Sequence, residues 1–87
     1  MGQQGWSTKQ QIEFYDLTRQ LLDEIREPDI VDAIKVVHGY EQLAVANLDE
    51  FSYWQKLRRG ILHLAKILET RGKNLEAMRL KSLAPTA

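Results

Sequence analysis

The chain has 87 residues, of which 44% are hydrophobic and 28% charged, and it contains no cysteine. A chain of this length makes one domain over residues 1–87, and its composition is that of a folded protein. Without cysteine there is no disulfide, no thiol nucleophile and no thiolate metal site. No apolar run reaches the ~18–20 residues that span a bilayer and no secretory signal is visible. We therefore expect an intracellular protein, cytoplasmic by default, without a membrane partner.

The formal net charge of zero conceals an asymmetry along the chain. Residues 1–50 carry four basic and ten acidic residues, a balance of −6, whereas residues 51–87 carry eight basic and two acidic residues, a balance of +6. One interpretation is that the two halves neutralise each other at a shared surface. The other is that the second half presents a basic face to an anionic partner. The sequence leaves both interpretations open.

A first helix is predicted over residues 8–26, after an N-terminal arm at 1–6. Two capping boxes suit its start, Ser7 with Gln10 and Thr8 with Gln11. An apolar stripe at helical spacing follows, formed by Phe14, Leu17, Leu21 and Ile25 and widened by Ile12, Tyr15 and Leu22. Pro28 disfavours helical geometry in the residue before it, so the helix should end near residue 26. Trp6 is expected to fold back onto this helix.

A second helix is predicted over residues 29–46, with Asp29 able to accept from the free N–H groups of its first turn. Its residues keep helical spacing at Ile30, Ile34, Val37 and either Tyr40 or Glu41. The β-branched residues would also suit a strand, but no later segment alternates with period two to pair with it. The pattern does not decide whether Gly39 ends this helix after His38 or is tolerated inside it.

A third helix is predicted over residues 48–71, with Asn47 and Glu50 as a capping box. Its apolar stripe is the clearest in the chain: Phe51, Trp54, Leu57, Ile61, Leu64 and Leu68. Gly72 is placed to end it in a left-handed conformation. Gly60 lies inside the helix at a cost of about 1 kcal/mol relative to alanine, which a close helix crossing or simple tolerance would explain.

A short fourth helix is predicted over residues 74–83, capped by Asn74 and with Leu75, Met78 and Leu83 as its apolar residues, before a frayed tail at 84–87. Together these segments predict an all-α domain, a small bundle of three to four helices.

Catalytic and metal-binding constellations are missing from the pattern. His38 and His63 lie 25 residues apart, and neither has a second ligand three or four residues away. We expect His38 at a helix end and His63 in solvent. No nucleophile elbow, phosphate-binding loop or dinucleotide fingerprint occurs. The sequence therefore predicts no enzyme, no metal or other cofactor and no small-molecule substrate.

The third helix carries the clearest candidate for a binding surface. Basic residues follow one another at steps of 3, 4 and 3 and so share one face opposite the apolar stripe. Such a row could follow a phosphate backbone or bind an acidic helix, although an ordinary solvated face looks the same. With a flanking arginine and a tyrosine expected to be exposed, the candidate basic face is Tyr53, Lys56, Arg58, Arg59, His63 and Lys66.

The second helix has more apolar residues than one face of a short helix can bury. The surplus indicates an exposed interface or a homodimer surface, with Val31, Val36, Tyr40 and Val45 as the candidates. We therefore expect a non-catalytic protein–protein interaction module, adaptor or regulatory, that binds another protein or itself. The alternative is a nucleic-acid-binding accessory domain that uses the basic face of the third helix.

Overall fold

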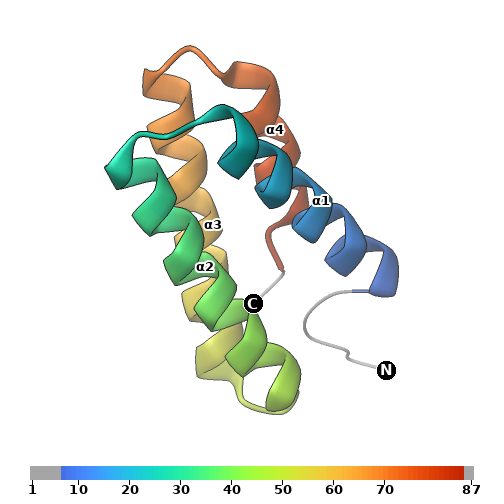
Figure 1. Ribbon diagram of the computed structural model, residues 1–87. Coiled ribbons are helices and arrows are strands. Elements are labelled where there is room, and N and C mark those ends of the chain that lie inside the picture. The colour runs from blue at the N-terminus through green and yellow to red at the C-terminus, as the bar shows by residue number, and fades with distance from the viewer. Residues whose placement is uncertain (1–6, 86–87) are drawn as a thin grey trace.

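The computed structural model describes residues 7–85 of the chain. Four α-helices follow one another along it: α1 Thr8–Glu24, α2 Pro28–Ala46, α3 Phe51–Thr70 and α4 Asn74–Leu83. The described residues contain no strand. The protein is thus a small all-α helical bundle, as predicted (Figure 1). The predicted arm at residues 1–6, including Trp6, lies outside the described residues.

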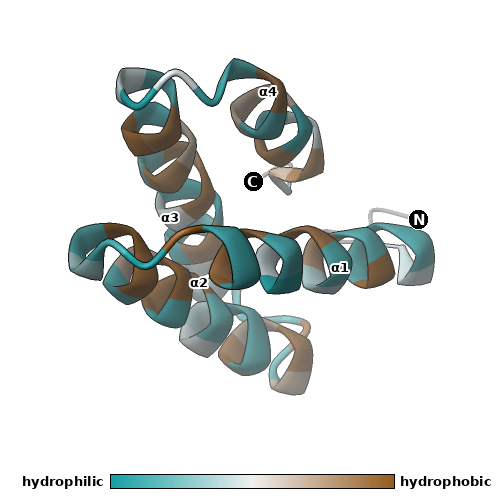
Figure 2. Ribbon diagram, turned by 45° about the horizontal axis from the view of Figure 1, so that its top comes forward, coloured by the Kyte–Doolittle hydropathy of each residue, from teal (hydrophilic) through white to brown (hydrophobic). Residues whose placement is uncertain are grey.

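The helices are arranged around α3. It packs along α2 on one side and along α4 on the other, and α1 crosses to contact α2 and α4 without close backbone contact with α3 (Figure 2). The backbones of α1 and α2 diverge from the short connection that joins them, so that few residues of the two helices lie close together. The resulting molecule measures 38 × 20 × 19 Å.

Each helix contributes one apolar stripe to a single core. The central residues of the predicted stripes in the first three helices are buried, except that Tyr40 is half-buried and Phe51 is 43% exposed. The residues predicted to widen the first stripe are exposed: Ile12, Tyr15 and Leu22. Leu75 and Met78 of α4 are also exposed, because the short helix buries only one side. The core consists of Phe14, Leu17, Leu21, Ile25, Ile30, Ile34, Val37, Ala44, Trp54, Leu57, Ile61, Leu64, Ala65, Leu68, Ala77, Leu80 and Leu83.

The start of α1 decides between the two predicted capping boxes. The backbone N–H of Gln10 donates to Ser7 Oγ at 3.2 Å, and the N–H of Ser7 donates to Gln10 Oε1 at 2.9 Å. The helix ends at Glu24, two residues earlier than predicted, because Ile25 adopts an extended conformation (φ −116°, ψ 126°). That conformation carries the Ile25 side chain into the core, where it is 5% exposed.

The second helix begins at Pro28 and continues to Ala46 without a break at Gly39. Proline suits the first helical position because its missing N–H has no partner there anyway. Asp29 lies inside the first turn, where its Oδ1 accepts the N–H of Ile30 at 2.9 Å. A Cβ atom built on Gly39 would meet nothing within 4 Å, so the glycine is tolerated on the exposed side of α2.

The predicted capping box at Asn47 and Glu50 was wrong. Asn47 ends α2, and the amide N–H of Glu50 donates to the carbonyl oxygen of Asn47 at 2.9 Å in a turn. The indole N–H of Trp54 donates to the carbonyl oxygen of Leu48 at 3.0 Å. A buried indole needs an acceptor, and the turn that precedes α3 provides this carbonyl. The helix itself starts at Phe51, because Glu50 before it is extended (φ −88°, ψ 97°).

Gly60 marks a close contact between α2 and α3. A Cβ atom at this position would lie 3.1 Å from Val37 Cγ2, which is tighter than an ordinary van der Waals contact. The glycine therefore lets the two helices approach, and the close-crossing interpretation holds.

Gly72 ends α3 in a left-handed conformation with φ 78°, as predicted. The N–H groups of Gly72 and Lys73 donate to the carbonyls of Glu69 and Leu68, which is the hydrogen-bond pattern of a Schellman motif. Helix α4 has its predicted bounds, but Lys73 rather than Asn74 is its N-cap.

The start of the predicted frayed tail is packed. Ala84 is half-buried and Pro85 is buried, and the carbonyl oxygen of Pro85 accepts from Arg58 Nη1 at 3.1 Å. Residues 86–87 lie outside the described part of the chain.

Candidate protein-binding surface

The candidate basic residues of α3 mostly form one exposed row. Lys56, Arg59, His63 and Lys66 are all exposed, on the side of the helix away from Trp54, Leu57 and Ile61. None of the four forms an ion pair with any described residue. We call these four residues the α3 basic row.

Tyr53 and Arg58 were included in the candidate basic face, but they lie on the two flanks of this row. Tyr53 is half-buried and packs against the core, because it lies beside Gly60 on the flank that faces α2. Its ring still borders the row, with the ammonium group of Lys56 6.0 Å from the ring centroid. Arg58 lies on the other flank, where it donates to the carbonyl oxygen of Pro85 at 3.1 Å.

The four candidate apolar residues of α2 fall on two different flanks of the helix. Val36 and Tyr40 are one turn apart on the same side, and Leu43 continues their stripe. Val31 and Val45 lie on the opposite flank, towards α1, and 14 residues separate them. The structure therefore brings together only half of the predicted apolar interface. It adds Leu43, which is 42% exposed, next to Val36 at 53%.

The stripe on α2 runs alongside the α3 basic row. Tyr40 Cδ2 lies 4.0 Å from the position of a Cβ atom on Gly60, so these two residues mark where the helices meet. Residues three and four positions apart are neighbours on a helix, so Val36 and Leu43 flank Tyr40, and Lys56 and His63 flank Gly60. We call Val36, Tyr40 and Leu43 together with the α3 basic row the α2–α3 surface. It combines exposed apolar groups with cationic side chains.

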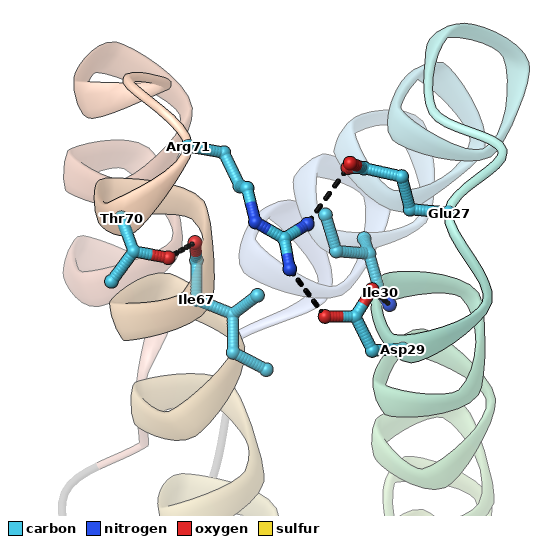
Figure 3. Close-up of polar contacts among 6 residues, drawn as sticks. All are labelled: Glu27, Asp29, Ile30, Ile67, Thr70 and Arg71. Atoms are coloured by element: carbon cyan, nitrogen blue, oxygen red, sulfur yellow. Dashed lines mark hydrogen bonds and ion pairs between the residues drawn. The ribbon is translucent and has the colours of Figure 1, made fainter.

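Most basic residues of the second half are left without acidic partners by the fold. Arg71 pairs with Glu27 Oε1 at 2.8 Å and with Asp29 Oδ2 at 2.5 Å, and joins the end of α3 to the start of α2 (Figure 3). This arginine holds the pKa of the Asp29 carboxyl below its ordinary value, chiefly through their hydrogen bond. Lys81 pairs with Glu69. Among the described residues, Arg71 is thus the basic residue of the second half that pairs with acids of the first half. The α3 basic row forms no such pairs.

A polar network that the sequence did not predict lies between α1 and α2. Glu41 is only 1% exposed, and its carboxylate accepts from Tyr15 Oη at 2.5 Å and from Gln11 Nε2 at 2.9 Å. Partial burial and the bond to Glu41 raise the pKa of the Tyr15 hydroxyl. The long side chains of Gln11 and Tyr15 span the space that the diverging backbones leave. One signal was present in the sequence, since Glu41 occupies a position of the apolar stripe four residues after Val37.

His38 belongs to the same network and is not at a helix end. Its Nε2 lies 2.8 Å from Thr18 Oγ1, and the Thr18 hydroxyl donates to the carbonyl oxygen of Phe14 at 2.9 Å. Because the hydroxyl has one proton, Nε2 of His38 must be the donor in their shared bond. Burial lowers the pKa of His38, and the nearby Glu41 carboxylate partly opposes that effect. We call Gln11, Tyr15, Thr18, His38 and Glu41 the α1–α2 seam.

The seam is built as a structural contact. No buried side-chain nitrogen or oxygen among the described residues lacks a hydrogen-bond partner. Within residues 7–85, no three His, Asp or Glu side chains are grouped so that they could hold a metal ion. No helix in that range is long and apolar enough to cross a membrane.

Comparisons with known proteins do not name a relative for this chain. No family model, no curated protein and no solved structure gives a significant match.

Proposed function

We propose that the domain is a non-catalytic module that binds another protein through the α2–α3 surface. The observation that supports the proposal is an apolar stripe on α2, with Val36 and Leu43 exposed and Tyr40 half-buried next to Gly60 of α3, the helix that carries the α3 basic row. An amphipathic helix with acidic flanks complements both parts of this surface. Its apolar side would cover Val36, Tyr40 and Leu43, and its carboxylates would face the cations of α3.

The two parts of the surface would contribute differently to binding. Covering Val36 and Leu43, which are 53% and 42% exposed, removes apolar area from water and supplies affinity. The cationic side chains, which remain solvated, mainly speed the encounter and select partners of opposite charge. Such a complex should weaken with salt without being abolished by it.

A nucleic-acid-binding accessory domain is the second candidate. It is favoured by the spacing of the α3 basic row, which places its cations along about 15 Å of helix. The exposed apolar stripe has no role in contacts with phosphates, and the net charge of zero adds no general attraction. We therefore rank protein binding first.

Amide chemical shifts of the labelled domain distinguish the two candidates. The probes are a designed helical peptide with leucines at positions i, i+4 and i+7 and glutamates beside them, its scrambled sequence, and a short DNA duplex. Protein binding predicts that the helical peptide shifts the resonances of Val36, Tyr40, Leu43 and residues 56–66, and that the scrambled peptide does not. Shifts caused by the duplex alone and confined to residues 56–66 would favour the second candidate. Absence of shifts with all three probes would contradict both.

A matched pair of variants tests whether the apolar stripe takes part. Leu43→Asp should weaken binding of the helical peptide by about tenfold, because it places a charge where an apolar contact is proposed. Leu75→Asp is the control, since Leu75 is equally apolar and 68% exposed but lies on α4. Equal losses in the two variants would show that the α2–α3 surface is not the binding site.

A further inference from the structure

The outer side of α1 carries a row of side chains with the same spacing as the α3 basic row. Glu13, Asp16, Gln20 and Asp23 follow at steps of 3, 4 and 3, as Lys56, Arg59, His63 and Lys66 do. Residues at these steps share one face of a helix. All four α1 residues are exposed, and none forms an ion pair with a described residue. We call them the α1 acidic row.

The two rows match position by position when the helices run in the same direction. Glu13 then faces Lys56, Asp16 faces Arg59 and Asp23 faces Lys66. The uncharged Gln20 falls opposite His63, so that no acid or base is left without a counterpart. In the opposite direction Gln20 would face Arg59 and Asp16 would face His63, and two charges would lose their partners.

The rows cannot meet within one molecule. Helices α1 and α3 make no close backbone contact, and both bury their inner faces in the same core. Their outer faces therefore point away from each other on different sides of the bundle. Each molecule presents one row of each sign, and each row is free to meet the opposite row of another copy.

We propose that the partner at the α3 basic row is a second copy of this chain, whose α1 lies parallel to α3 with its acidic row in the register given above. This inference rests on the proposed function for the α3 basic row alone. The apolar stripe of α2 takes no part in it, so this contact, unlike a complex that also covers the stripe, is lost at high salt. The contact joins two different surfaces, so it is head-to-tail and extends into chains or closes into a ring. Because its contacts are exposed ion pairs, the association is weak and sensitive to salt.

Sedimentation or light scattering of the described domain tests the association directly. At about 1 mM protein and about 20 mM salt, the average mass should rise above that of the monomer, and it should return to the monomer value at about 300 mM salt. A monomer at low salt, or association that persists at high salt, would overturn the proposal.

Charge reversal tests the register. In Asp16→Arg two arginines face each other across the contact, and in Arg59→Asp two aspartates do, so each variant should remain monomeric. The double variant Asp16→Arg/Arg59→Asp restores an opposite pair and should associate like the original chain. Asp32→Arg/Arg59→Asp is the matched control, because it has the same net charge and Asp32 is exposed on α2 outside both rows. Association of this control, or failure of the first double variant, would overturn the register.

Failure of this inference and failure of the proposed function have different signatures. A chain that stays monomeric at low salt while the acidic helical peptide shifts residues 56–66 keeps the proposed function and loses the self-association. If neither the peptide nor a second copy perturbs those residues, the proposed function and the self-association are both contradicted.

Discussion

The α1–α2 seam and the α3 basic row are both polar, but only the seam finds its partners inside the fold. In the seam, the Glu41 carboxylate is held by Tyr15 and Gln11, and His38 is held by Thr18. In the row, no side chain forms an ion pair with a described residue. Polar groups that are buried need partners to avoid a desolvation cost, whereas exposed cations are satisfied by water. The seam should therefore control stability, and the row should control binding.

Breaking the seam at Glu41 should have the largest effect on stability. Glu41→Ala removes the acceptor of two hydrogen bonds and leaves a void, so we expect the free energy of unfolding to fall by about 2–3 kcal/mol. Glu41→Gln keeps the shape and an acceptor and should lose about 1 kcal/mol. Urea denaturation measures both. A loss below about 0.5 kcal/mol for Glu41→Ala is what an exposed surface residue would give, and it would show that the seam does not stabilise the fold.

Gly39 and Gly60 are both inside helices, but Gly39 is exposed whereas Gly60 lies at the contact between α2 and α3. Gly39→Ala meets open space and should stabilise the protein by about 0.5–1 kcal/mol, because alanine loses less conformational entropy in a helix. Gly60→Ala would place its Cβ 3.1 Å from Val37 Cγ2, so the packing cost should cancel or reverse that gain. Denaturation of both variants checks the order, and equal gains would mean that α2 and α3 are not closely packed at Gly60.

The seam should also make stability depend on pH through His38. Its pKa in the fold is lower than the ordinary value of 6.5, so the unfolded chain takes up the proton first as the solution is acidified. Stability should therefore fall as the pH drops through about 6.5, and the fall should end below the lower pKa of the folded state. His38→Gln keeps an N–H donor without a titrating ring. Melting temperatures between pH 7.5 and about 5 should show a flatter profile for this variant. An unchanged profile would exclude His38 as the cause.

Neutralising the α3 basic row should have the smallest effect on stability. The triple variant Lys56→Gln/Arg59→Gln/Lys66→Gln should change the free energy of unfolding by less than about 0.5 kcal/mol, with a slight gain at low salt as like charges are removed. The matched control Arg26→Gln/Lys35→Gln/Arg79→Gln removes the same charge from exposed positions outside the row. A clear loss in the first variant alone would show that the row has a structural role.

Much of the fold followed from local patterns in the sequence. The bounds of α4, the left-handed Gly72 and the buried stripe of α3 depend on neighbours a few residues away, which periodicity and end signals report well. The start of α3 did not follow: Asn47 ends α2, and a turn with a bond from the Glu50 N–H to the Asn47 carbonyl precedes the helix. The indole of Trp54 also binds this turn, at the Leu48 carbonyl, and that contact depends on packing the local signal does not report.

The candidate site followed from the sequence only in part. The exposed row on α3 is set by spacing within one helix, and the sequence located it. Tyr53 was expected to be exposed but is half-buried, because it packs against the core. Arg58 flanks the row as expected, but its bond to the Pro85 carbonyl, 27 residues away, could not be read from the sequence. The four apolar candidates on α2 lie on two different flanks for the same reason. The positions of α3 and α1 decide which flank of α2 is exposed, and the sequence does not report those positions.

The sequence by itself determined three amphipathic helices, indicated a short fourth, and placed opposite charge on the two halves of the chain, because all of these depend on residue type and short-range spacing. Only the tertiary structure decided which charges meet. It placed Arg71 against Glu27 and Asp29, buried Glu41 between Tyr15 and Gln11, and left the row on α3 in solvent. These outcomes depend on how the helices cross and diverge, which distant packing contacts set and no local pattern encodes.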